Sequence, residues 1–184
     1  NESIVPVTGF FKVPAIEFGD PVVQYISDFN SANNDFVGNF FSIAQPSGFN
    51  DGAIHSAHPY PNGFGLTDSK SNFAYILKKP ITISANNPYM MFDEIGLVEY
   101  TGNSNKDMIV VEGSKNNGAT WETLLNPYSA FIYSSWRTAF NIGDDATPSL
   151  YRSRLINLIS SGKFVAGEKV LIRFRLTADA AGNG

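Results

Sequence analysis

The sequence predicts an all-β chain folded as an antiparallel two-sheet jelly-roll β-sandwich, and three observations support this prediction. Only 16% of the 184 residues are charged, whereas there are 16 glycines and 10 prolines. Hydrophobic residues make up 43% of the chain and aromatic residues 14%, which can fill the core of one domain. Several segments alternate apolar and polar residues with a period of two. Together these features favour short strands joined by turns over long helices.

The clearest predicted strand covers residues 168–177, where every second residue is apolar: Val170, Ile172, Phe174 and Leu176. Segments 107–114 and 89–100 contain apolar residues in succession, so we expect central strands with both faces buried. Short runs bounded by Pro, Gly, Asn and Asp predict further strands at 10–18, 22–29, 36–44, 73–84, 120–125, 130–136 and 152–159. We also expect Val110, Trp121, Ile172 and Phe174 to share one core layer.

The remaining segments are predicted to be less regular. Pro14 interrupts the first strand candidate, which makes that segment an edge strand or an irregular lead-in. Residues 134–141 could form a short helical turn, and residues 50–71 show little periodicity and are expected to be a long loop. No internal repeat or interdomain linker is visible, so residues 1–184 are expected to form a single domain.

A β-hairpin is predicted at Ser114–Trp121, whose sequence SKNNGATW resembles the S-x-D-x-G-x-T-W pattern with Asn116 at the aspartate position. A short polar side chain would cap the turn, Gly118 would adopt a left-handed conformation, and Trp121 would pack beneath it. In sialidase-like propellers this motif repeats and lies away from the catalytic site. Its single occurrence here therefore indicates a hairpin and not glycoside cleavage.

Charge and composition exclude several functions. The net charge of −4 does not provide the positive field that phosphate-backbone binding needs, so nucleic acid is not expected as a partner. The absence of cysteine excludes disulfides, thiolate nucleophiles and cysteine-bound zinc. No apolar run is long enough for a transmembrane segment, and no export signal is evident. The chain begins at Asn1 and not Met, which predicts a processed or trimmed product of a longer gene.

Asp93 and Glu94 form the first candidate site. Successive strand residues point to opposite faces, so one carboxylate should face an apolar layer, where it needs a partner. That partner could be a buried arginine or a structural calcium ion, because calcium prefers hard oxygen ligands. A zinc site at His55 and His58 would need a third ligand, and Pro59 disfavours the helix that such a pair usually occupies.

Arginines and aromatic residues are the candidates for ligand binding. Arg152 and Arg154 share a strand face, as do Arg173 and Arg175. If the two strands were neighbours, four guanidinium groups would form a patch for carboxylate or sulfate groups. The alternative is ordinary pairing with acidic residues on the sheet, for which the candidates are Glu94, Glu99 and Glu112.

Aromatic rings in predicted loops could form a platform on which sugars stack, and the candidates are Tyr60, Tyr128 and Trp136. Filling of the core is the alternative role for each ring. No nucleophile with its base is recognisable, and the carboxylates on strands show no catalytic spacing. We therefore expect no enzymatic activity and no cofactor beyond the calcium considered above.

Several segments together resemble a jelly-roll module of large secreted Bacteroidetes proteins: residues 92–99, 110–115, 118–121, 149–152, 156–158 and 170–176. Such modules are similar to MAM-like and carbohydrate-binding jelly rolls. Their parent proteins are commonly exported by the type IX secretion system and carry sorting domains. The resemblance thus implies a jelly-roll fold and an extracellular or cell-surface location.

The resemblance also implies a missing strand. In that family the strand after Arg175 is followed by a Trp-Gly-Trp-containing last strand, and this sequence ends at Gly184. We expect the resulting open sheet edge, next to residues 168–177 or a neighbour, to be completed by residues after Gly184 or by another chain.

These observations lead to two functional hypotheses. The first is a non-catalytic adhesion or glycan-binding module that is secreted or displayed at the cell surface. The alternative is a structural accessory domain that makes protein contacts in an envelope or secretion complex. A hydrolase is the least favoured function.

Overall fold

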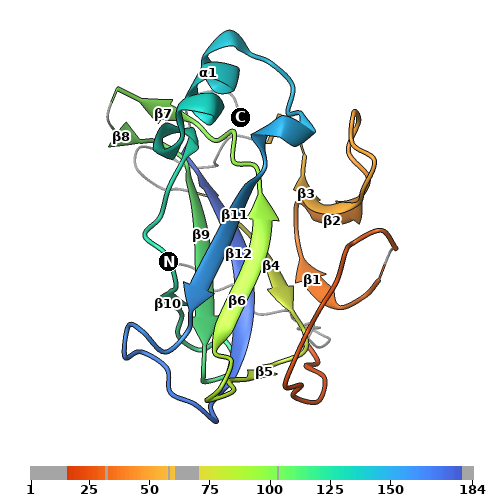
Figure 1. Cartoon of the computed structure of the whole chain (residues 1–184), viewed down its shortest axis with the longest axis vertical. Coiled ribbons are helices and arrows are strands. Elements are labelled where there is room, and N and C mark those ends of the chain that lie inside the picture. The colour runs from red at the N-terminus through yellow and green to blue at the C-terminus, as the bar shows by residue number, and fades with distance from the viewer. Residues whose placement is uncertain (1–15, 32, 58, 61–70, 103, 180–184) are drawn as a thin grey trace, which may run out of the picture.

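The computed structural model describes residues 16–31, 33–57, 59–60, 71–102 and 104–179. Within these residues the fold consists of antiparallel β-sheets and one α-helix, which confirms the all-β prediction (Figure 1). The main sheet has the order β1 (Phe36–Gly38), β4 (Ser71–Leu77), β12 (Lys169–Ala178), β9 (Met108–Ser114) and β10 (Glu122–Thr123), with β5 (Ile81–Thr82) also paired to β12. Three two-stranded sheets are β6 (Tyr89–Glu94) with β11 (Arg152–Asn157), β2 (Phe41–Ala44) with β3 (Ala53–Ser56), and β7 (Tyr100–Thr101) with β8 (Ser104–Asn105).

The core lies between the main sheet and the β6–β11 pair, which Figure 1 shows in front of β9 and β12. Met90 and Phe92 of β6 and Ile156 of β11 point inward and pack with apolar residues from the main sheet. The buried members of this cluster are Ile83, Val111, Ile156, Leu158, Phe164, Val170 and Ile172. Alternation along β6 and β12 therefore produces two facing apolar surfaces, as the period of two predicts.

The predicted core layer is correct for two of its four residues. Ile172 is buried in the inter-sheet cluster, and Phe174 packs against the ring of Phe92 with centroids 5.4 Å apart. Val110 is also buried, but it pairs with Arg175 and therefore lies on the opposite face of the main sheet. Trp121 lies on that face too, over Arg173. The strand register decides the face, and the sequence of one strand does not specify its register against another.

The strand predicted at 168–177 is confirmed as β12, but it is not an edge. Residues 173–178 of β12 pair with β4, and residues 171–177 pair with β9 on the other side. The open edge is therefore not at this strand, and the alternative of an edge at a neighbouring strand stays a prediction. In the described part of the chain, β6 and β11 each pair on one side, with each other.

Segment 89–100 differs from its prediction as a central strand with two buried faces. It forms β6 as far as Glu94, and β6 alternates between exposed and half-buried residues. Tyr89 is 53% exposed and Met91 is 76% exposed, because no layer of described residues covers their side of the sheet. Apolar residues in succession therefore did not indicate burial on both faces here.

The predicted strand at 130–136 is wrong, whereas the helical turn predicted at 134–141 is confirmed. A 3-10 helix covers Ala130–Ile132, and its N-terminus is capped by the side chain of Ser129. Helix α1 follows at Ser134–Ile142 and ends at Gly143, whose φ of 70° is favourable only for glycine. A second 3-10 helix covers Pro148–Leu150. Among the described residues, no helix has the length and apolar character needed to cross a membrane.

Other predicted strands are interrupted or absent. Segment 36–44 divides into β1 and β2 around Phe40, whose φ is 61°, and segment 73–84 divides into β4 and β5 before Ile81. Segment 22–29, which is fully described, contributes only an isolated bridge between Val22 and Ile81. The predicted loop 50–71 contains β3, and its residues 58 and 61–70 lie outside the described residues. Most of the strand predicted at 10–18, including Pro14, also lies outside them.

The predicted hairpin connects β9 to β10 and has the expected geometry. The hydroxyl of Ser114 accepts a hydrogen bond from the Gly118 backbone N–H at 2.8 Å, and Asn116 Oδ1 accepts one from the Thr120 backbone N–H at 2.9 Å. Gly118 has a φ of 86°, and a Cβ at this position would contact the Trp121 ring. The motif therefore fixes where the Trp121 side chain lies on the main sheet.

Candidate functional site

The three aromatic residues predicted to form a sugar platform are buried. Tyr60 is 5% exposed, Tyr128 is 3% exposed and Trp136 is fully buried. Stacking on a sugar requires an exposed ring face, so the platform prediction is corrected: these rings fill the core. The structure also places them in two different clusters, because Tyr60 packs with Phe73 and Leu176 whereas Tyr128 and Trp136 pack together.

The polar atoms of these rings have partners inside the protein. The Tyr60 hydroxyl donates to Asp107 Oδ2 at 2.7 Å and accepts from the Glu99 backbone N–H. The Trp136 indole N–H donates to the Leu150 carbonyl at 2.7 Å. Burial raises the pKa of Tyr60, and the nearby Asp107 carboxylate raises it further. These hydroxyl and indole groups thus tie distant segments of the chain together.

Glu94 and Arg154 form an ion pair on the inward face of the β6–β11 sheet. Arg154 Nε donates to Glu94 Oε1, and the Tyr128 hydroxyl donates to the other carboxylate oxygen. Arg154 also donates to the Tyr133 hydroxyl at 3.1 Å, and its guanidinium lies 4.6 Å from the Tyr128 ring centroid. Burial raises the pKa of Glu94 even though the hydrogen bonds from Tyr128 and Arg154 oppose this effect. The arginine partner predicted for a buried carboxylate is therefore present.

Asp93 and Glu94 do not converge on one ion. Asp93 is exposed on the outward face of β6 and accepts a hydrogen bond from the Ser153 hydroxyl, whereas Glu94 points inward to Arg154. Adjacent residues of an extended strand point in opposite directions, so their carboxylates cannot share a calcium ion. The calcium site predicted from this pair is corrected for that reason.

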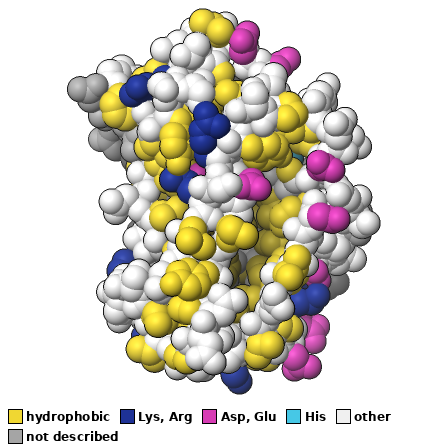
Figure 2. All heavy atoms as spheres, in the orientation of Figure 1, with side chains coloured by type: hydrophobic (Ala, Val, Ile, Leu, Met, Phe, Trp, Pro, Cys, Tyr) yellow, Lys and Arg dark blue, Asp and Glu magenta, His cyan; other side chains and the backbone are white. Residues whose placement is uncertain are grey.

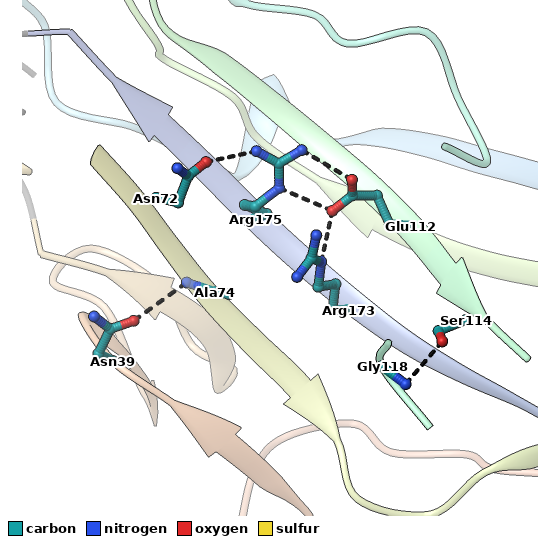
Figure 3. A network of polar contacts seen from close by, with 8 residues as sticks. All are labelled: Asn39, Asn72, Ala74, Glu112, Ser114, Gly118, Arg173 and Arg175. Atoms are coloured by element: carbon teal, nitrogen blue, oxygen red, sulfur yellow. Dashed lines mark hydrogen bonds and ion pairs between the residues drawn. The ribbon is translucent and has the colours of Figure 1, made fainter. Parts of the chain in front are cut away.

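The four arginines do not form one patch, because β11 and β12 belong to different sheets. Arg152 donates to Ser135 Oγ and to the Tyr151 carbonyl, both at 2.7 Å, so it is engaged beside helix α1. Arg173 and Arg175 instead share the Glu112 carboxylate on the main sheet (Figure 3). Pairing with acidic residues of the sheets, the alternative considered from sequence, is therefore confirmed for Arg154 with Glu94 and for Arg173 and Arg175 with Glu112.

Three carboxylates distant in the sequence lie together in the structure. Oxygen atoms of Glu99, Asp107 and Asp179 lie within 4.8 Å of one another, and they are the one such group among the described residues. Asp107 already accepts hydrogen bonds from the Tyr60 hydroxyl and from the Asp179 backbone N–H at 2.8 Å. Hard oxygen ligands of this kind suit calcium. Sequence reasoning missed the group because its members lie 8 and 72 residues apart, in segments with no common motif.

Of the histidines considered for zinc, His55 lies on β3 opposite Ser42 and is half-buried. His58 lies outside the described residues.

A polar depression of about 410 Å³ lies beside the β2–β3 hairpin. Its polar lining comes from four exposed residues, namely Asn30, Gln45, Asn50 and Asp51. Phe29 and Ile43 contribute the large apolar side chains that line the depression. No sequence motif indicated this site, because its residues come from three separate segments of the chain.

The wall of this depression depends on a close approach of two backbone segments. The Gly52 N–H donates to Asn30 Oδ1 at 2.7 Å, and a Cβ at Gly52 would lie 2.0 Å from the Phe29 carbonyl oxygen. Phe29 itself has a φ of 57°, which is unusual for a bulky residue and costs free energy. Only glycine fits at position 52 while Phe29 and Asn30 keep their places.

The outward face of the β6–β11 sheet exposes large apolar side chains beside the polar residues Asp93 and Ser153. Met91 and Leu155 are directly paired across the two strands and are 76% and 66% exposed, and Tyr89 lies on the same face. Figure 2 shows hydrophobic side chains gathered on this side of the molecule. An exposed apolar face of this kind is a feature of surfaces that contact other macromolecules.

Comparisons with known proteins gave no match: no family model, no curated protein and no solved structure is significantly similar to this chain.

Proposed function

We propose that this chain is a non-catalytic glycan-binding module whose ligand occupies the polar depression beside the β2–β3 hairpin. The observation that carries this proposal is the lining of the depression by Asn30, Gln45, Asn50 and Asp51. Amide groups both donate to and accept from hydroxyl groups, which are the main polar groups of a sugar, and a carboxylate accepts hydrogen bonds from them. Pockets for small apolar ligands are lined mostly by hydrophobic side chains, so this composition favours a polyhydroxylated ligand.

The groups available for binding are Asn50 and Asp51. Gln45 Nε2 donates to the Phe49 carbonyl at 2.7 Å and Asn30 Oδ1 accepts from Gly52, so these two amides hold the loops in place. Asn50 and Asp51 also line the depression and are exposed. The depression is therefore built by two structural amides and presents two further polar side chains to solvent.

The wider setting of this proposal follows the family resemblance. A secreted or cell-surface location, export by a type IX system and completion of the sheets as a jelly-roll sandwich are consistent with an antiparallel β-fold whose main sheet is partly covered by a second layer. In a module of this kind, binding to a glycan would attach the parent protein to a glycan-bearing surface. We use the word adhesion for this attachment.

A glycan array with the purified chain tests the proposal. We expect binding to a defined set of glycans, and a loss of at least about tenfold in the Asn50→Ala/Asp51→Ala variant, since each lost hydrogen bond is worth about 1 kcal/mol. Asn86→Ala, which changes an exposed loop amide elsewhere, is the matched control and should bind like the unmodified chain. Absence of binding across the array, or equal binding by the double variant, would overturn the proposal.

The second candidate function is structural, and the exposed face around Met91 and Leu155 favours it. The one-sided pairing of β6 and β11 would also let a strand from another chain extend that sheet. The two functions can be separated experimentally. Leu155→Ser should weaken a protein contact and leave glycan binding unchanged, whereas Asn50→Ala/Asp51→Ala should do the reverse.

A further inference from the structure

The face of the main sheet opposite the inter-sheet core carries two arginines and one carboxylate. Arg173 and Arg175 alternate on β12, and the register places Glu112 of β9 opposite Arg173. Arg175 donates two hydrogen bonds of 2.8 Å to the Glu112 carboxylate, from Nε to Oε2 and from Nη2 to Oε1. Its Nη1 donates to Asn72 Oδ1 at 2.6 Å (Figure 3). All three nitrogens of Arg175 are therefore engaged.

Arg173 is held differently. Only its Nε donates to Glu112, at 2.6 Å, and within the described residues Nη1 and Nη2 have no hydrogen-bond partner. Figure 3 shows this single contact. The centroid of the Trp121 ring lies 4.0 Å from the guanidinium carbon of Arg173, and the Arg173 side chain is 19% exposed. Glu112 and Trp121 thus fix the plane of the guanidinium while its terminal N–H groups reach solvent.

The charges on this face do not balance. In the described part of the chain, Glu112 is the one carboxylate paired with either arginine, so two positive charges meet one negative charge. The Glu112 side chain is only 5% exposed and is already satisfied by three hydrogen bonds. One positive charge on this face therefore has no carboxylate partner among the described residues, and the terminal nitrogens without a hydrogen bond are those of Arg173.

We propose that Arg173 binds an oxyanion, a carboxylate or sulfate group carried by a ligand, through Nη1 and Nη2. A planar guanidinium fork matches such groups with two parallel hydrogen bonds, and stacking on an aromatic ring orients it in advance. This site shares no residue with the polar depression and does not depend on that site binding a glycan. It also differs from the predicted four-arginine patch, because Arg152 and Arg154 belong to the other sheet.

Titration followed by ¹⁵N NMR tests this inference with an internal control. The chain has two tryptophans, so two indole N–H signals are expected. Sodium sulfate, compared with sodium chloride at equal ionic strength, should shift the Trp121 signal to saturation. The Trp136 signal should stay in place, because that indole is buried and bonded to Leu150.

Two variants distinguish bidentate binding by the planar guanidinium of Arg173 from attraction of sulfate to any positive charge. Arg173→Lys keeps the charge but loses the planar fork, so we expect its sulfate affinity to fall about tenfold or more. Arg137→Lys is the matched control, since Arg137 also lies over an aromatic ring, Phe131, and should leave sulfate binding unchanged. Thermal melting of each variant shows whether it is folded, and the titration of the unmodified chain stands without them.

Two organic anions identify the source of the oxyanion. Tighter binding of glucuronate than of N-acetylglutamate at the Trp121 signal would assign the site to an acidic saccharide, and the reverse order would assign it to an acidic peptide. A Trp121 signal that none of the three anions shifts, or an Arg173→Lys variant that binds sulfate as tightly as the unmodified chain, would overturn the proposal.

Discussion

Replacement of Phe174 by alanine tests the packing of the two β layers. Phe174 belongs to β12 of the main sheet, and its ring meets Phe92 of β6 at an interplanar angle of 79°. A fully buried phenylalanine costs about 3–5 kcal/mol when it is truncated to alanine, and Phe174 is only partly buried. We therefore expect a loss of about 3 kcal/mol in the free energy of unfolding. For a chain of this length that corresponds to a fall in Tm of about 6–12 °C.

Urea unfolding of Phe174→Ala and of four further variants gives the decisive measurement. Phe92→Leu and Phe174→Leu, alone and combined, form a double-mutant cycle whose coupling should be about 0.5–1.5 kcal/mol for an edge-to-face pair. Leu155→Ala is the control, because Leu155 is 66% exposed on the outward face and should change stability by less than about 0.5 kcal/mol. A neutral Phe174→Ala, or a coupling of zero, would refute the placement of β6 over β12.

Three further predictions concern polar groups and the hairpin. Tyr60→Phe should lower the free energy of unfolding by about 1–3 kcal/mol, measured by urea unfolding, because it removes a hydrogen bond to the buried Asp107 carboxylate. Burial raises the pKa of Glu112, but the hydrogen bonds from Arg175 and Arg173 outweigh this and hold the pKa below its usual value. Stability from this carboxylate is thus present at neutral pH and is lost as the pH falls through its folded pKa, so Glu112→Gln should flatten the acid side of the curve of Tm against pH. Gly118→Ala should cost about 1–2 kcal/mol in thermal unfolding, because a residue with φ of 86° is strained once it has a Cβ; an unchanged Tm would contradict the turn geometry.

Local sequence patterns predicted several elements correctly. The alternation in 168–177 predicted β12, and the Ser114–Trp121 motif predicted a turn whose hydrogen bonds and left-handed glycine are present. These features depend on residues within a few positions of one another, so a local pattern is sufficient. Predictions failed where burial depends on the rest of the fold: residues 89–94 form a strand, yet one face of it is exposed.

Site predictions failed for a related reason. Tyr60, Tyr128 and Trp136 were all expected in loops, but Trp136 lies in helix α1 and Tyr128 forms a β-bridge with Ile109. A position outside the strands does not decide exposure, and all three rings are buried. Asp93 and Glu94 were correctly expected to differ in environment, because strand alternation is local, and Arg154 is the partner of Glu94. The polar depression had no local signal of any kind.

The sequence by itself determined the antiparallel β class, the strongest strand, the hairpin and the need of an inward carboxylate for a partner, because each follows from the period of two or from turn chemistry. The tertiary structure alone decided which strands are neighbours, and hence that Arg173 and Arg175 share Glu112 whereas Arg154 meets Glu94. It also brought Asn30, Gln45 and Asn50 to one depression. The physical reason is that strand register and the packing of separate sheets depend on contacts between residues far apart in the chain, which no local period encodes.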